Sequence, residues 1–411
     1  MKSLVFLLTL HISMIFFSFM AILGYEYTSI EGNASYLIAT SILTIISLIY
    51  IFIEILIIRR LPLRSINLFF FVLPILMCFI FFFESPESEV TVRVFKLSLG
   101  FVFPSIFIGS FLALSKLSFL SFIKWLDILI LVLSFGLIMS MPKIIFENTL
   151  SLGGMSSQSI SYTAAYTFSI SLFMLLFGRE FPRFTFFQSK IYNLILISFI
   201  LIQILSIFLS GGRGGFVLLF LSSIILILIK NKGLKINIRF LKILFLVTVT
   251  LFTFFQNLPE NLSNMINSGT DRIFSYISNE GIDLSETSGR DIVYETAIKM
   301  IADKPFIGYG IYDYIDEFYK LIGTEDIPYP HNLFLELMIQ GGMFFLLLWL
   351  ILLLIFTIKL IKITKHDKIN LIMIPFSLFP LTLLQFSGTY LSTGMFWFVF
   401  SYILSYNSRL S

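Results

Sequence analysis

The chain has 411 residues, of which 57% are hydrophobic, 17% aromatic and 13% charged, and its formal net charge is +4. Such a composition excludes a soluble globular protein of this length, so the chain belongs in a membrane. Its single cysteine, Cys78, excludes an internal disulfide framework.

Apolar runs long enough to cross a bilayer recur along the chain. A spanning helix needs about 20 apolar residues, and these runs predict an all-α polytopic membrane protein with about 12 transmembrane helices and one large extracytoplasmic helical loop. The first run is interpreted as a retained helix because no small-residue cleavage site follows Leu23. The predicted spans are residues 3–23, 35–58, 66–83, 92–115, 122–141, 159–177, 191–209, 214–229, 240–256, 332–358, 370–386 and 391–405.

The distribution of basic residues predicts the orientation. Lysine and arginine gather in alternate connections, as they do on the cytoplasmic side of membrane proteins. We therefore expect both termini to be cytoplasmic and few basic residues in the short outer connections, namely Arg93, Lys96, Lys143 and Arg213. The predicted parts are residues 1–256 with transmembrane helices 1–9, 257–331 as the extracytoplasmic loop, and 332–411 with helices 10–12.

Arg213 stands among four glycines in an otherwise apolar stretch. The 40 residues from Ile191 to Lys230 would form a helix of about 60 Å, twice the hydrocarbon thickness, so the chain must turn back at Ser210–Gly215. This places Arg213 at the outer face. Two interpretations stay open: the arginine reaches a lipid phosphate from the interface, or it joins the glycine amides in an anion-binding concavity.

The long polar segment before residue 331 contains a predicted amphipathic helix, Ser288–Ile301, which stops at Asp303–Pro305. Glu295 and Lys299 are spaced for a favourable ion pair. Arg290 lies in the first turn, on the same face as Tyr294, where a cation is unfavourable for the helix. This cost favours a functional role for Arg290, and a structural salt bridge to an acid of the loop is the alternative.

His331 is the histidine that the predicted topology places at the outer membrane surface, since His11 lies in the first span and His366 in an inner connection. A histidine side chain can accept or donate a proton near neutral pH. The alternative role is that of a cap or interface residue where the tenth span begins. Asn332 and Glu336 are one helical turn apart, and we expect Glu336 to hold Asn332 or an arginine.

These segments together resemble the O-antigen ligase and polymerase superfamily of bacterial lipid-linked glycan enzymes. Their order along the chain, their placement on one membrane face and the large loop before the His-Asn pair carry the resemblance. The segments are Ser210–Gly215, Gly289–Ala297, Lys304–Gly310, Pro330–Glu336 and Gly341–Gly342.

The resemblance implies a glycosyltransferase without metal or cofactor, which acts at the outer face of the bacterial inner membrane on undecaprenyl-pyrophosphate-linked sugars. Arg213 and Arg290 correspond to the family arginines that engage the pyrophosphate, and His331 to its outer-face histidine. These three are the predicted catalytic residues. The predicted substrate-binding residues are Arg213, Arg290, Asn332, Tyr294 and Glu336.

Elementary chemistry supports such a site. A pyrophosphate is a good leaving group, so fixed guanidinium groups can stabilise the developing charge without a metal. With three histidines and no clustering with acids, we expect no bound metal. His331 is placed to take the proton of an acceptor sugar hydroxyl. Aromatic faces for glycan rings are expected from Tyr276, Tyr294, Tyr309, Tyr312, Tyr314 and Tyr319.

The predicted function is the polymerisation of lipid-linked oligosaccharide repeat units into O-antigen or capsular polysaccharide. Family ligases often show His-Asn, nine residues, Gly, two residues, Gly; here Gly342 fits and Phe345 replaces the last glycine, which favours a polymerase. The alternatives are a ligase that moves the glycan to a lipid A-core or other acceptor, and a glycan transporter or flippase, although no internal repeat is found. Expected partners are membrane lipids, a chain-length regulator and a flippase of the pathway, and no nucleic acid.

Overall fold

The computed structural model describes most of the chain and divides it into two compact units. The first unit contains Met1–Ile12, Asn33–Ile123 and Ser278–Ser411, and the second contains Ser13–Gly32 and Lys124–Ile277. Each unit is described by itself. The described residues are 1–26, 31–58, 65–147, 151–231, 264, 267, 270–271, 277–278, 281–282, 290–323 and 329–406.

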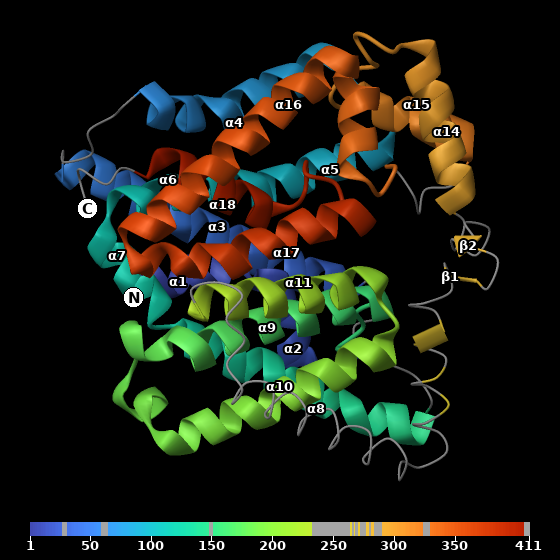
Figure 1. Cartoon of the computed structure of the whole chain (residues 1–411). Coiled ribbons are helices and arrows are strands. Elements are labelled where there is room, and N and C mark those ends of the chain that lie inside the picture. Colours follow the sequence, from blue (N-terminus) through green and yellow to red (C-terminus); the bar gives the residue numbers. More distant parts are fainter. Residues whose placement is uncertain are drawn as a thin grey trace. The chain divides into compact units, whose positions relative to one another are not determined.

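The described helices account for nearly all of both units (Figure 1). Helices of the first unit are α1 (Lys2–Leu10), α3 (Glu31–Ile58), α4 (Ser65–Glu84), α5 (Glu89–Leu97), α6 (Phe103–Leu114), α7 (Lys116–Ile123), α14 (Arg290–Asp303), α15 (Asp313–Ile322), α16 (Leu333–His366), α17 (Met373–Phe386) and α18 (Gly394–Ser405). Those of the second unit are α2 (Ile12–Ile22), α8 (Leu126–Glu147), α9 (Ser157–Phe177), α10 (Lys190–Ser210) and α11 (Arg213–Lys230). Two short strands, β1 (Ile277–Ser278) and β2 (Gly281–Ile282), pair with each other.

The described residues contain 8 helices long and apolar enough to cross a membrane, or up to 9 if the broken pair α1 and α2 is one span. This identifies a multi-pass membrane protein. The predicted count of about 12 spans and the single large loop are not confirmed. Two further apolar helices, Phe69–Glu84 and Gly394–Ser405, are shorter, and the predicted span 240–256 lies outside the described residues. The 8 spans are Ser35–Ile55, Glu89–Leu114, Lys116–Met141, Ser157–Glu180, Lys190–Ser210, Arg213–Lys230, Leu333–His366 and Lys368–Phe386.

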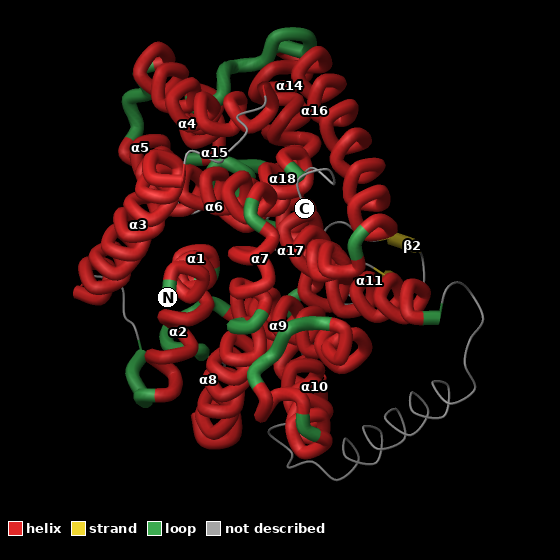
Figure 2. Tube along the Cα trace, turned by 90° about the vertical axis from the view of Figure 1, so that its left-hand side faces the viewer, coloured by secondary structure: helices red, strands yellow, loops and turns green. Residues whose placement is uncertain are grey.

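In the first unit, α6 and α18 lie side by side because glycines remove side chains from their contact. A Cβ atom on Gly109 or Gly394 would come under 3.0 Å from the main-chain oxygen of Phe398 or Phe101. α14 packs against α16, whose long axis is seen in Figure 2. Helix α14 and the helix that follows His331 therefore share one framework.

In the second unit, α9 is the central helix, and α8, α10 and α11 pack around it. Its buried hydroxyl groups bond to neighbouring helices, as polar groups must where no water reaches them. Ser171 accepts from the Gln203 amide at 3.1 Å, and the hydroxyls of Ser169 and Ser222 lie 2.7 Å apart. These bonds set the position of α9 between α10 and α11.

Candidate functional site

Arg213 is the first residue of α11 and directly follows the turn that ends α10. Gly211 has a φ of 62°, which glycine adopts without strain, and Gly212 is the N-cap of α11. Both helices are candidate membrane spans. The predicted turn between two spans at Ser210–Gly215 is therefore confirmed.

The glycines around Arg213 serve close helix packing. A Cβ atom on Gly212 or Gly215 would come under 3.0 Å from the side chain of Ser161, and one on Gly214 would overlap with the Tyr162 hydroxyl. The Ser161 hydroxyl donates a hydrogen bond of 3.0 Å to the Gly212 carbonyl. The turn is thus held against α9, a role for these glycines that the sequence did not indicate.

The electrostatics at Arg213 favour an anion. A guanidinium at a helix N-terminus lies at the positive end of the helix dipole, an arrangement that costs stability in the absence of a negative partner. Gly212 has no side chain with which to cap the first amides of α11. The amides of a helix N-terminus and an adjacent guanidinium both attract phosphate groups.

The structure describes α14 from Arg290 on, and for this residue it describes only the main chain. α14 ends at Asp303, as predicted, and Glu295 and Lys299 form the predicted ion pair at 2.7 Å. Both of these side chains are exposed to solvent. The described side chains of α14 that are buried are Val293, Thr296, Ala297 and Met300.

His331 immediately precedes the N-cap of α16 and has a φ of 52°, which is uncommon for a residue with a side chain. The ring of Tyr329 packs edge-on against the imidazole, with ring centroids 4.8 Å apart. Asn332 is the N-cap, and its side-chain oxygen accepts from the amides of Phe334 and Leu335 at 3.0 and 3.2 Å. The left-handed backbone and the cap together orient the half-buried imidazole.

Glu336 lies one turn further along α16 and is buried. Its carboxylate accepts from the hydroxyls of Tyr314, at 2.8 Å, and of Thr389. The sequence predicted Asn332 or an arginine as its partner, whereas the donors that the structure gives are these two hydroxyls. Glu336 thereby joins α15 and the α17–α18 connection to the helix that begins after His331.

α16 is kinked at Gly341–Gly342, where the backbone leaves the helical conformation. The freed carbonyls of Ile339–Gln340 accept from the amides of Tyr309–Gly310 at 2.8 and 2.9 Å. The Met343 amide donates to the Pro305 carbonyl at 2.8 Å. The sequence motifs Lys304–Gly310 and Gly341–Gly342 are therefore brought together by hydrogen bonds between main chains.

Side chains are excluded from this contact. A Cβ atom on Gly308 would overlap with the main chain of Gln340, and one on Gly342 would overlap with that of Phe306. Gly308 and Gly342 have φ values of 64° and 63°. Glycine is needed on both sides because the two main chains touch and both turn through the left-handed region.

A second contact ties α15 to the connection between α4 and α5. Glu84 accepts from the three amides of Ile311–Asp313 at 2.6 to 3.2 Å. Asp316 accepts from the amides of Glu87–Ser88 at 2.8 and 3.2 Å and from the hydroxyl of Thr91. Burial raises the pKa of Asp316, but these hydrogen bonds outweigh it and hold the pKa below its usual value. Each segment thus caps the helix of the other.

The predicted tyrosine surface is smaller than expected. Tyr312 and Tyr314 are fully buried, so the prediction that they contact a glycan is wrong. Their burial follows from the aromatic contact of Tyr312 with Phe81 and the bond of Tyr314 to Glu336. Tyr294, Tyr309 and Tyr319 are half-buried and stay candidates, and Tyr276 lies outside the described residues.

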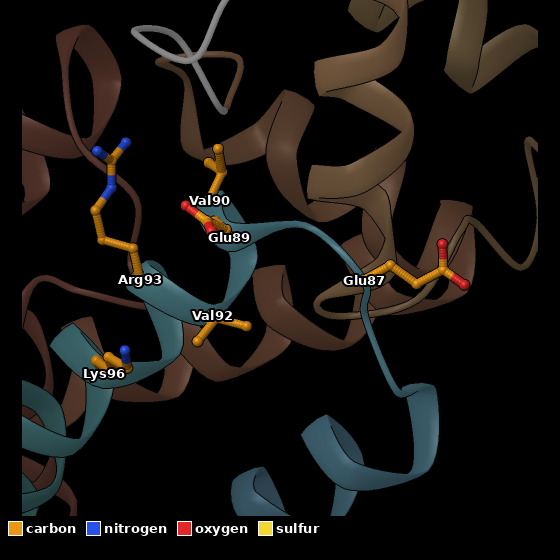
Figure 3. A pocket seen from close by; sticks show the side chains of 6 residues that line it. All are labelled: Glu87, Glu89, Val90, Val92, Arg93 and Lys96. Carbon is orange, nitrogen blue, oxygen red and sulfur yellow. The ribbon is translucent and has the colours of Figure 1, made fainter.

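A cavity of about 520 Å³ lies along α5, and the sequence did not identify it. Arg93 and Lys96 were predicted on the outer side without a role. Glu89, Arg93 and Lys96 are spaced as i, i+4 and i+7, so they lie on one face of a helix. This spacing is the sequence pattern from which the charged face could have been predicted. The described residues that line the cavity are Glu87, Glu89, Val90, Val92, Arg93 and Lys96 (Figure 3).

Two predicted residues share one structural position, the start of a helix. Arg213 begins α11 in the second unit and His331 precedes α16 in the first, while Arg290 lies in α14, which is described from this residue on. The prediction that all three side chains share one cavity stays a prediction. Within the described ranges, no three side chains of His, Cys, Asp or Glu come together as a metal site would require.

Comparison with protein families gives one match. Residues 196–350 match the family described as O-Antigen ligase, a range that contains Arg213, Arg290, His331 and the Gly341–Gly342 kink. Comparisons with curated proteins and with solved structures returned no match. As its motifs predicted, residues 196–350 are similar to the O-antigen ligase family.

Proposed function

We propose that the protein polymerises undecaprenyl-pyrophosphate-linked oligosaccharide repeat units into O-antigen or capsular polysaccharide. The reaction takes place at the outer face of the bacterial inner membrane, with both termini in the cytoplasm. The observation that carries this proposal is the position of Arg213 as the first residue of α11, with Arg290 in α14, both within the family match. A cation at the positive end of a helix favours a phosphate ligand.

The proposed step is a glycosyl transfer from one lipid to another. The hydroxyl of the acceptor sugar attacks the anomeric carbon of the growing glycan, a new C–O bond forms, and the bond to the lipid pyrophosphate breaks. Arg213 and Arg290 stabilise the charge that collects on the leaving pyrophosphate. His331 takes the proton of the attacking hydroxyl. No metal or cofactor enters this step.

The remaining predicted substrate-binding residues take narrower roles. The side-chain oxygen of Asn332 caps α16, so this residue acts by holding His331 at the start of the helix. Glu336 supports the same segment through Tyr314 and Thr389. Tyr294, half-buried on α14, offers an aromatic face next to the start of that helix.

A ligase is the second candidate, because the matching family is described as O-Antigen ligase. A ligase would transfer the finished glycan to a lipid A-core or other acceptor through the same groups. Phe345 stands where family ligases often have glycine, and a Cβ atom on Gly341 would overlap with it. We therefore prefer a polymerase, which works with a chain-length regulator and a flippase.

The test is a gene deletion followed by complementation. If the protein is a polymerase, deletion leaves acceptors that carry at most single repeat units, whereas deletion of a ligase leaves long chains unattached. Complementation with Arg213→Ala, Arg290→Ala or His331→Ala should not restore long chains on a gel. Wild-type chain lengths in all three variants would refute the assignment, and translocation of lipid-linked sugar without bond formation in vesicles would indicate a flippase instead.

A further inference from the structure

A charged surface of the first unit lies on α5, which begins the candidate span Glu89–Leu114. One side of α5 is buried through Val90, Thr91, Val94 and Phe95. The other side carries Glu89, Arg93 and Lys96, all exposed. The helix is therefore strongly amphipathic at the point where an ordinary span would be apolar all round.

The depth of the two cations makes them costly. At 1.5 Å per residue, Arg93 lies about 6 Å and Lys96 about 10 Å beyond Glu89 along the helix. Charges within a membrane span are expensive and generally face a partner or a wet cavity. Here both side chains line the cavity of about 520 Å³, a size typical of small-molecule sites.

The cavity lies close to the segment that holds His331. Thr91 of α5 donates a hydrogen bond to Asp316 of α15, and Tyr314 of α15 donates one to Glu336, five residues after His331. Burial and the charge of Glu336 raise the pKa of Tyr329 to about 12, and the charge of Arg93 opposes this rise. Tyr329 in turn packs against the imidazole of His331. The cations of α5 and the proposed general base are therefore neighbours within one unit.

The acidic side chains of the cavity come before the basic side chains along this segment of the chain. Glu87 points away from Arg93, whereas the side chains of Arg93 and Lys96 extend from successive turns of the helix (Figure 3). Glu89 stands one turn before Arg93 and would repel a phosphate but accept hydrogen bonds from sugar hydroxyls. A lipid-linked sugar fits this order if its diphosphate lies at Arg93 and Lys96 and its sugar at Glu89.

We propose that Arg93 and Lys96 bind the diphosphate of the acceptor, the second lipid-linked repeat unit. This inference rests on the proposed function, because a transfer between two lipid-linked sugars requires two diphosphates to be held at once. Arg213 and Arg290 hold the donor, and the α5 cavity holds the acceptor with its sugar beside His331. The chain then has two anion sites of different composition.

The experiment counts bound lipids by native mass spectrometry of the full chain in zwitterionic nanodiscs, with undecaprenyl diphosphate as the probe. We expect two equivalents on the wild-type protein and one on Arg93→Ala/Lys96→Ala. Lys362→Ala/Lys365→Ala, which removes the same charge from exposed positions at the end of α16, should keep two. Arg93→Lys/Lys96→Arg should also keep two, which separates loss of charge from loss of fold.

Each other outcome has one meaning. Two equivalents on Arg93→Ala/Lys96→Ala would overturn this inference and leave the proposed function standing. Displacement of the second equivalent by phosphatidylglycerol at equal concentration would overturn it as well, because the cavity would then be a general phospholipid site. A wild-type protein that binds no undecaprenyl diphosphate would refute the proposed function itself.

Discussion

Glycines allow close contacts at two places in this chain, and the two places differ in the charged residues beside the glycines. In the second unit, Gly212–Gly215 lets α11 touch Ser161 and Tyr162 of α9. In the first unit, Gly308 and Gly342 let two main chains touch. The first segment contains a cation at the start of a helix, and the second contains none.

This comparison distinguishes residues that a motif needs for packing from residues that packing does not explain. Glycines in both segments are explained by close contact, so they report the framework of the fold. Arg213 is not explained by that contact, since glycines pack without it. The charged residue beside a packing glycine is therefore the better candidate for chemistry, and variants of the two kinds should behave differently.

The largest effect is expected from the charged residues. Arg213→Ala or His331→Ala should lower the rate of polymer formation by about 10²- to 10³-fold, since each removes a group that stabilises or relays charge in the transfer. Arg213→Lys keeps the charge but loses the planar guanidinium, so we expect an intermediate loss. Glycan length on gels, at matched protein levels, measures the effect.

A fold-matched control sharpens this prediction. Ser223→Ala removes a hydroxyl of α11 that bonds within its own helix, to the carbonyl of Leu219, and should leave glycan length unchanged. If Arg213→Ala and Ser223→Ala both gave wild-type glycan, Arg213 would have no part in the reaction.

The next effect is expected from the framework glycines, on stability and not on chemistry. Gly342→Ala should lower the free energy of unfolding by about 2 to 5 kcal/mol, because alanine meets both an unfavourable φ and an overlap with Phe306. Gly323 has a φ of 76° and open space around it, so Gly323→Ala should cost only about 1 kcal/mol. Denaturation in detergent compares the two, and equal losses would mean that the contact contributes nothing.

Local features of the sequence predicted the local parts of this structure. The turn at Ser210–Gly215 and the end of α14 before Pro305 were found because glycine, proline and the length of an apolar run act on nearby residues. The break of the first span at His11 was missed, since it does not interrupt the apolar pattern.

Contacts between distant segments could not be predicted in this way. Glu87 and Asp316 are 229 positions apart, and only the fold brings them together. The burial of Tyr312 and Tyr314 and the cavity beside Arg93 depend on the same long-range packing. The candidate catalytic residues were found because their motifs are local, whereas the residues that support them were not.

A smaller loss of stability is expected at the contact between α15 and the connection from α4 to α5. This contact is made by carboxylates, whereas the contact at Gly342 is made by main chains. Asp316→Ala should cost about 1.5 to 3 kcal/mol, since hydrogen bonds to a charged group are lost. Hydrogen exchange should rise at the amide of Ser88, whereas Glu84→Ala should raise it at Tyr312. Glu87→Ala, at an exposed carboxylate of the same connection, is the control, and equal exchange in all variants would contradict the reciprocal caps.

The smallest effect is expected from Asp313, whose pKa behaves in the opposite way to that of Asp316. Burial, together with the charges of Glu84, Asp316 and Glu317, raises the pKa of Asp313 to about 6 from its usual value of 3.8. The folded protein therefore binds this proton more tightly than the unfolded chain, and ionised Asp313 lowers stability at pH 7. This cost disappears as the pH falls from about 6 to below the usual aspartate value.

Asp313→Asn should accordingly raise the melting temperature at pH 7.5 and leave it unchanged at pH 3.5, with a small gain because the side chain is only half-buried. Asp316→Asn should do the reverse and lower the melting temperature at pH 7.5, since its pKa is held below the usual value and its contribution is lost only as the pH falls through that lowered pKa. Melting curves of both variants across this pH range make the comparison. A loss of stability at pH 7.5 in Asp313→Asn would contradict this prediction, because it would show that ionised Asp313, like Asp316, stabilises the folded protein.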